Sequence, residues 1–358
     1  MAKKKVKVEA GSTRSLLGNL GSALTGKGKL KSVAGGVNEY ASRGYDRLSD
    51  KELFTRAEYR PEELEPLSHV GYSYWRSSLR IYARNKTAMF FLCLIAVTLL
   101  FTIVQPYLPN QRDPIKINND ETGMQIRNRL PDEEYIFGTN AIGQDLWSRT
   151  WSGTRTSLFI GFTVACVEAL IGVLLGVLWG YARKLDFIFT ELYNIFDNVP
   201  QTLILILISY IMHPSLKTII FALCLTGWLT TALYIRNQVI IIRDRDYNLA
   251  SRCLGTPVRR IILRNLLPFL VSIITMRMAM AIPYAISSEV FVTYVGLGLP
   301  LNIPSLGNLI VSGIDKMMDP NLRYQLIFPT VVLSIVTVSF YIIGNALADA
   351  SDPRNHID

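Results

Sequence analysis

The strongest constraint on this chain is a set of uninterrupted apolar runs, each long enough to cross a lipid bilayer as a helix of about 20 residues. Hydrophobic residues make up 50% of the 358-residue chain, and the mean hydropathy is +0.27. A soluble domain rarely reaches this apolar content while also carrying such runs. The sequence therefore predicts an all-α integral membrane protein.

The apolar runs predict six membrane-spanning helices. The expected spans are residues 88–104, 157–181, 192–211, 216–242, 269–294 and 326–348, which together make a six-helix domain at 88–348. The longest connections are a mixed polar loop at 105–156 and a basic loop at 243–268. Residues 349–358 follow the last span as a short C-terminal segment.

The N-terminal part of the chain is basic. Residues 1–70 are polar and rich in Gly and Ser, and we expect a tail of this composition to be disordered or to lie on anionic lipid. Residues 1–87 contain 17 Lys and Arg against 9 Asp and Glu, which is nearly the whole net charge of +9. Residues 71–87 combine aromatic side chains with arginines, a composition typical of an elbow helix lying at the membrane interface.

The distribution of positive charge predicts the orientation. Positive charge gathers in three segments: the tail, the Arg183-Lys184 turn and residues 243–264. In a six-span protein these three segments all fall on the same side of the membrane. Loops rich in Lys and Arg remain in the cytoplasm. We therefore expect both termini to be cytoplasmic, and we explain the positive charge by anchoring at the membrane rather than by nucleic-acid binding.

The basic loop at 243–268 has an internal pattern. Tyr247, Ala250 and Leu254 are spaced as one face of a short helix, and Gly255 supplies a flexible position that ends such a helix. Pro257 can then open a second short helix that carries several arginines. A short helix with small residues at the membrane surface suits docking into a partner's groove. The alternative is a basic surface loop that only follows the positive-inside rule.

Acidic residues inside apolar runs are the candidates for a transport path. Glu168 lies in the middle of the second run, Asp197 near the start of the third and Glu289 near the end of the fifth. A carboxylate there is costly and normally faces a partner or a water-filled cavity. A role as a structural hydrogen-bonding group is an equal alternative for Glu168. On the same run, Gly172, Gly176 and Gly180 recur every fourth residue and predict close contact with another helix.

The sequence predicts no catalytic, cofactor or metal site. The four cysteines and three histidines are scattered and form neither a disulfide framework nor a metal-ligand spacing. Residues 21–27 match the first part of a phosphate-binding P-loop, but Gly28 follows where the motif needs Ser or Thr. We therefore expect a protein that is not an enzyme.

The loop pattern resembles the EAA loop of ABC-transporter importer permeases. The matching positions are Ala250, Ser251, Gly255, Ile262, Leu267 and Pro268. Leu249 stands where the family has Glu, which puts in doubt any salt bridge of that Glu. By this resemblance, the residues that couple to an ATPase would be Tyr247, Leu249, Ala250, Ser251, Leu254 and Gly255.

Three further segments resemble one subfamily, the C-type permease of oligopeptide and dipeptide (Opp/Dpp) importers. They are Phe137-Gly138-Thr139-Asn140 with Gly143-Gln144-Asp145 and Ser148-Arg149, the Gly/Pro-rich residues 296–308, and residues 344–353. Asn140 and Gln144 replace the Asp and Arg of the subfamily pattern. The resemblance covers about residues 72–353 and leaves only the tail unexplained.

The resemblance implies a type I ABC importer permease fold and a function. The chain would be one permease subunit that moves oligopeptides or dipeptides across a bacterial or archaeal cytoplasmic membrane by alternating access. Its implied partners are a second six-helix permease, two ATPase subunits, an extracytoplasmic peptide-binding protein and membrane lipid, with no nucleic acid. ATP and Mg would bind at the ATPase partners, and this chain would bind no cofactor.

Alternatives from other classes remain open at this stage. Nickel permeases and other small-solute ABC permeases share the same motifs. An ion channel could also have six spans, but it would not need a groove-docking loop. An intramembrane enzyme would need paired catalytic groups, which the sequence does not offer.

The predicted orientation can be tested by thiol labelling of a cysteine-free chain in intact cells. Asn119→Cys and Ser305→Cys are expected to react with an impermeant reagent, because both fall in predicted outer loops. Arg259→Cys is expected to react only after the membrane is permeabilised. Labelling of Arg259→Cys from outside would reverse the orientation.

Overall fold

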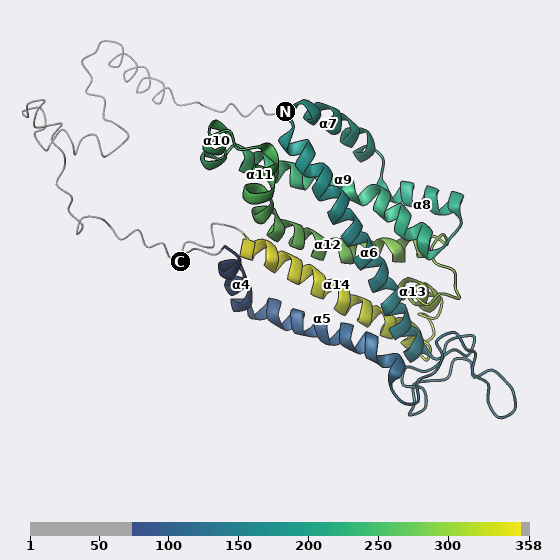
Figure 1. Ribbon diagram of the computed structural model, residues 1–358. Coiled ribbons are helices and arrows are strands. Elements are labelled where there is room, and N and C mark those ends of the chain that lie inside the picture. The colour runs from purple at the N-terminus through teal and green to yellow at the C-terminus, as the bar shows by residue number, and fades with distance from the viewer. Residues whose placement is uncertain (1–73, 352–358) are drawn as a thin grey trace, which may run out of the picture. The chain divides into compact units, whose positions relative to one another are not determined.

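A computed structural model describes residues 74–351, and within this part all regular secondary structure is helical (Figure 1). The predicted basic tail at 1–70 and residues 352–358 of the predicted C-terminal segment lie outside the described residues. Within residues 74–351, five helices are long and apolar enough to span a membrane, and the number rises to six if a bent pair of shorter helices counts as one span. The prediction of an all-α membrane protein is therefore confirmed.

The described part opens with two helices, α4 (Tyr74–Arg84) and α5 (Lys86–Val104). Asn85 separates them, and its side-chain oxygen accepts a hydrogen bond from the N–H of Ala88, which caps α5. Both helices contact the last helix, α14 (Tyr324–Ser351), as Figure 1 shows. A separate helix thus stands where the elbow was predicted, and its position at a membrane surface stays a prediction.

The next helix, α6 (Leu146–Tyr181), begins eleven residues before the predicted span. The expected loop at 105–156 therefore ends at Asp145, whose carboxylate accepts from the N–H of Ser148 at 3.0 Å and caps the helix. The first turns of α6 are polar in sequence but buried, as Arg149, Thr150 and Thr154 are. Hydropathy misplaces this boundary because it measures composition and does not detect a cap.

Close packing of α6 against α9 (Leu216–Arg243) forms the longest helix–helix contact in the described part. An added Cβ at Gly172 would meet Thr231, one at Gly176 would meet the Ala232 carbonyl, and one at Gly180 would meet the Arg236 carbonyl. The predicted close helix contact at the three glycines is confirmed. Small residues permit it because they let two backbones approach.

The third predicted span, 192–211, is not one continuous helix. The chain forms α7 (Arg183–Asp197) and α8 (Gln201–Met212), which are bent by 74° at the break. Pro200 lies in the break, and a proline without an N–H cannot continue the helical ladder. The sequence reading placed Pro200 near the start of a span, where proline is tolerated. It missed that the apolar residues before the proline form a separate helix.

The basic loop folds into α10 (Asp246–Cys253), α11 (Val258–Ile261) and a π-helical turn at Ile262–Leu266, which leads directly into α12 (Leu267–Tyr294). In this wide turn the N–H of Leu267 donates to the carbonyl of Ile262. Pro268 explains the turn, since it cannot donate to the Arg264 carbonyl and its ring would crowd that group. Helix α12 packs on α6 and α14, and the short α13 (Leu306–Ile314) packs on α14, α12 and α6.

The loop between α5 and α6 is folded around one buried tyrosine. Tyr135 is 2% exposed, and two guanidinium groups approach its ring, Arg112 at 3.7 Å and Arg129 at 4.9 Å from the ring centroid. The arginines also pair with Glu134, at 2.7 and 2.8 Å. The N–H of Tyr135 donates to Asp132 at 2.7 Å and lowers the pKa of that carboxyl. This loop is therefore an ordered structure.

One position chosen for the labelling experiment is not accessible. Ser305 is 0% exposed, because its hydroxyl caps α13 by accepting from the Asn308 N–H and also donates to Glu289. Leu301, in the same connection, is 73% exposed and is the suitable cysteine position there.

The α6–α9 contact yields a stability prediction. Gly176→Leu is expected to destabilise the protein by about 1–3 kcal/mol, because the new side chain would collide with the backbone of α9. The measurement is the thermal unfolding midpoint of the purified protein in detergent. Leu174→Ala is the control, since Leu174 is 59% exposed on the same helix. An unchanged midpoint for Gly176→Leu would contradict the close contact.

Candidate functional site

The first candidate site is the outward surface of α10 and the turn that follows it, which we call the α10 surface. It consists of Tyr247, Leu249, Ala250, Ser251, Leu254 and Gly255. Leu254 is 86% exposed, and Tyr247 and Leu249 are nearly half exposed. Ala250 and Gly255 are exposed as well. The structure therefore collects all six predicted coupling residues on one short segment with an apolar, small-residue surface.

The end of α10 is held by a hydrogen-bonded Schellman turn. The N–H of Thr256 donates to the Ser251 carbonyl at 3.0 Å, and the N–H of Gly255 donates to the Arg252 carbonyl at 2.9 Å. Gly255 has φ +75°, in the left-handed region that a β-carbon disfavours. The prediction that Gly255 ends this helix is confirmed, and the turn makes the α10 surface well defined.

Asn248 fixes α10 from its buried side. Its side chain is 0% exposed and donates to the carbonyl of Ile242 at the end of α9, at 2.8 Å. Its amide oxygen accepts from Asn265 in the π-helical turn, also at 2.8 Å. One side chain therefore ties α10 both to the helix before it and to the start of α12.

Arg243 makes a second connection, to the end of α6. Its guanidinium donates to the Gly180 carbonyl at 2.7 Å and makes two hydrogen bonds to Asp244, at 2.9 and 3.0 Å. These bonds lower the pKa of the Asp244 carboxyl. A further arginine, Arg252, donates to the Arg243 carbonyl at 3.3 Å and lies over the Tyr181 ring. Arg243 thus ties the end of α9 to the end of α6, and Arg252 brings α10 against the same two helix ends.

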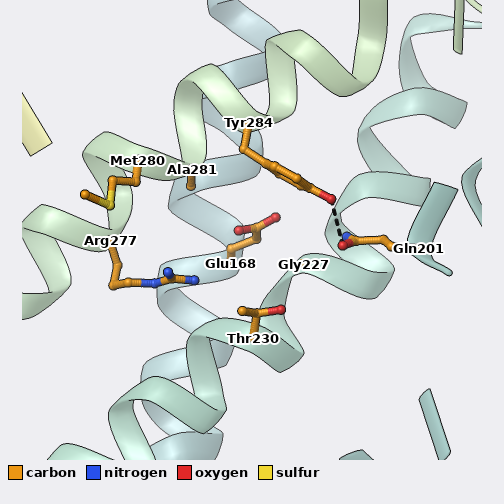
Figure 2. Close-up of a pocket in the computed structure, with 8 residues that line it drawn as sticks. All are labelled: Glu168, Gln201, Gly227, Thr230, Arg277, Met280, Ala281 and Tyr284. Atoms are coloured by element: carbon orange, nitrogen blue, oxygen red, sulfur yellow. Dashed lines mark hydrogen bonds between the residues drawn. The ribbon is translucent and has the colours of Figure 1, made fainter. Parts of the chain in front are cut away.

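The second candidate site is a partly open cavity of about 420 Å³ lined by residues of α6, α8, α9 and α12 (Figure 2). Its lining residues are Glu168, Gln201, Gly227, Thr230, Arg277, Met280, Ala281 and Tyr284. Tyr284 donates to Gln201 at 2.8 Å, and Gln201 donates to Thr226 at 2.7 Å, so α12, α8 and α9 share a polar contact. The volume lies within the roughly 300–1,000 Å³ that is usual for small-molecule pockets.

Glu168 reaches this cavity because Gly227 leaves room for it. The Glu168 side chain is 5% exposed and lies directly over Gly227, where an added Cβ would overlap the carboxyl group. Arg277 approaches from α12, with its guanidinium 5.3 Å from the Tyr234 ring centroid. Glu168 therefore lines a cavity, and its role as a path residue or a structural group stays a prediction.

Asp197 lies at a neighbouring hollow. It accepts a hydrogen bond from Tyr193 at 2.9 Å and lines a space of about 130 Å³ beside the α7–α8 bend. Gln201 and Thr230 line both this space and the main cavity. The structure therefore places Glu168 and Asp197 at adjacent polar spaces.

Glu289 does not line the cavity. Its carboxylate is 0% exposed and accepts hydrogen bonds from Ser305 at 2.9 Å, Thr293 at 3.1 Å and Ser157 at 3.5 Å. Ser157 in turn accepts from the Leu306 N–H at 3.2 Å. Glu289 thus holds the start of α13 against α6 and α12. The sequence placed it among path residues only because it is a carboxylate in an apolar run.

The sequence patterns above do not identify Asn248, Gln201, Tyr284 or Arg277 as site residues. Arg277 offered a usable signal, because a lone arginine inside an apolar run needs a polar environment. Asn248, Gln201 and Tyr284 offered none, since their importance depends on partners far apart in sequence.

Comparison with known proteins places these sites in context. A family model described as binding-protein-dependent transport system inner membrane component matches residues 172–357. A second, described as the N-terminal TM domain of oligopeptide transport permease C, matches residues 73–125. The two models together span most of the described residues.

Several relatives match along nearly their full length. The oligopeptide transport system permease protein AmiD of Streptococcus pneumoniae is 35% identical over 86% of this chain and 98% of its own length. The oligopeptide permease protein OppC of Bacillus subtilis is 31% identical over 85% of this chain and 97% of its own. The dipeptide permease protein DppC of Bacillus subtilis is 32% identical over 85% and 93%.

The Asn248 connection yields a test of rigidity. Asn248→Ala is expected to leave the Asn265 amide and the Ile242 carbonyl without this partner, at a cost of about 1–3 kcal/mol. Hydrogen–deuterium exchange of the backbone should speed up in α10 and in the π-helical turn, with α5 unaffected. Cys253→Ala, an exposed position on α10, is the control. Unchanged exchange in Asn248→Ala would show that α10 is held by other contacts.

Proposed function

Because the chain belongs to the binding-protein-dependent transport system inner membrane components, and within them to the oligopeptide and dipeptide permeases, we propose that it imports peptides as one transmembrane subunit of an ATP-driven transporter. The observation that carries the proposal is the α10 surface, an exposed segment whose helix is hydrogen-bonded to the end of α9 and to the turn before α12 and lies against the end of α6. In a permease of this family, such a surface offers an ATPase subunit a segment to bind, and movement of that segment would be passed to the helices attached to it.

The relatives support peptide as the substrate. Each of the three described above is named for oligopeptide or dipeptide transport, and the matches cover 93–98% of their lengths. The nickel alternative has no support among them. Membership in a transport permease family likewise argues against an ion channel or an intramembrane enzyme.

The partners follow from the proposed role. The family description itself names dependence on a binding protein. We further propose a second six-helix permease, two ATPase subunits that bind ATP and Mg, and a binding protein that delivers peptide from outside the cell. Exposed apolar side chains such as Phe90, Leu100 and Ile103 on α5 would face lipid or a partner helix.

Alternating access supplies the mechanism. ATP-driven closure of the ATPase dimer would move the α10 surface as one body. Asn248 would transmit that movement to the π-helical turn and α12, and Arg243 would transmit it to the end of α6. Helices α6 and α12 also carry Glu168 and Arg277, so the same movement would change access to the cavity. This chain would contribute no covalent chemistry.

The membrane and orientation remain part of the proposal. We propose that the chain works in the cytoplasmic membrane with α10 and both termini in the cytoplasm, which the distribution of Lys and Arg supports. The cavity would then receive substrate from the opposite side. The basic N-terminal tail would lie at the inner membrane surface, where anionic lipid attracts it.

The coupling role is tested by two substitutions on the α10 surface. Ala250→Glu is expected to prevent docking, because a large charged side chain replaces an exposed methyl group. Gly255→Val is expected to strain the left-handed turn by about 1–2 kcal/mol. Each variant should insert in the membrane and pair with the second permease, but lose bound ATPase or uncouple ATP hydrolysis from uptake.

The measurements are uptake of labelled peptide and recovery of ATPase subunits with the tagged permease. Ala250→Ser and Gly255→Asn are matched controls, since serine stays small and asparagine tolerates a positive φ. Both controls should retain most uptake. Normal uptake by Ala250→Glu and Gly255→Val would remove the coupling role of the α10 surface.

A further inference from the structure

The cavity contains two charged groups of opposite sign that do not satisfy one another. Glu168 extends from α6 and Arg277 from α12, and Figure 2 shows both side chains directed into the same space. Among residues 74–351, no ion pair joins Glu168 to Arg277. Arg236 of α9, in contrast, forms an ion pair with Asp186 of α7 at 2.7 Å. The other lining residues are uncharged.

Arg277 has unused hydrogen-bonding capacity. Its Nε atom is buried and has no hydrogen-bond partner within the described residues. Its guanidinium lies over the face of the Tyr234 ring, which stabilises the cation but accepts no directed hydrogen bond from Nε. A guanidinium with free donors is suited to binding a carboxylate.

Glu168 has the complementary capacity. The carboxyl group lies over Gly227, which has no side chain to cover it, and it faces the open space. A carboxylate accepts hydrogen bonds only, so its natural ligand is an ammonium or another cationic donor. The cavity that these two groups line has a volume of about 420 Å³, which is large enough to admit a small polar molecule.

From this arrangement we propose that the cavity is a binding site for zwitterionic substrate, in which Glu168 receives the α-ammonium group and Arg277 the α-carboxylate of a short peptide. Tyr284 and Gln201, joined by a hydrogen bond, offer polar groups for the peptide backbone between the two ends. The inference rests on the proposed peptide transport and assigns that function a recognition step within the membrane.

The alternative is a structural pair whose charges only neutralise each other at a distance. That role predicts that loss of either charge affects all ligands equally. End recognition instead predicts that each charge matters for one end of the peptide alone. Chemically blocked peptides separate the two roles.

The experiment measures equilibrium binding to the assembled transporter in nanodiscs. The probes are radiolabelled tri-alanine with free ends, N-acetyl-tri-alanine and tri-alanine amide. Wild type should bind tri-alanine about tenfold more tightly than either blocked form, since one charge-assisted hydrogen bond is lost in each. Glu168→Gln should bind tri-alanine about tenfold more weakly than wild type does. Its affinity for the N-acetyl form should equal that of wild type, because this peptide has no α-ammonium group to lose. Arg277→Gln should likewise bind tri-alanine about tenfold more weakly than wild type, and its affinity for the amide form should be unchanged.

Thr230→Val is the matched control, because it changes an uncharged lining residue and should affect the three peptides alike. Equal losses for all peptides in Glu168→Gln and Arg277→Gln would overturn end recognition in favour of the structural pair. Absence of wild-type binding in a transporter that imports tri-alanine would overturn it as well. Failure of the complete transporter with its binding protein to import any peptide would instead overturn the proposed function.

Discussion

The whole structure depends on one constraint, that backbone polar groups inside lipid must find partners within the protein. Helices meet this requirement along the spans, so every interruption needs a local solution. The α7–α8 break at Pro200 lies beside a polar hollow. The π-helical turn before Pro268 restores the ladder with a wider hydrogen bond. Each interruption adjoins one of the two candidate sites.

The same constraint decides how charged side chains are used. Glu289 accepts hydrogen bonds from the hydroxyl groups of Thr293 and Ser305 and so holds the start of α13 against α12. Arg236 closes on Asp186 and ties α9 to α7. Glu168 and Arg277 differ, because neither is closed off by such a partner and both face a cavity. The contrast between satisfied and open charges separates structural groups from candidate binding groups.

The two candidate sites are mechanically connected. Asn248 of α10 hydrogen-bonds the end of α9 and the turn before α12, and Arg252 of α10 lies over the Tyr181 ring at the end of α6. Helices α6, α9 and α12 also line the cavity. A displacement of α10 therefore acts on the walls of the cavity through continuous helices, and no separate transmitting element is required. This connection gives the proposed coupling a structural basis.

The sequence alone determined the fold class, the family, the helical contact at Gly172, Gly176 and Gly180, and the end of α10 at Gly255, because each depends on hydropathy, local spacing or backbone conformation. It could not determine the start of α6 at Leu146, where a capping aspartate outweighs polar composition. It also could not separate Glu289 from Glu168, since both are lone carboxylates in apolar runs. Only the tertiary structure decided which of them has hydrogen-bond donors around it and which faces open space. The tertiary structure also decided which partners Asn248 has and that Arg277 reaches the cavity. Both depend on residues that are far apart in sequence and meet only in the folded chain.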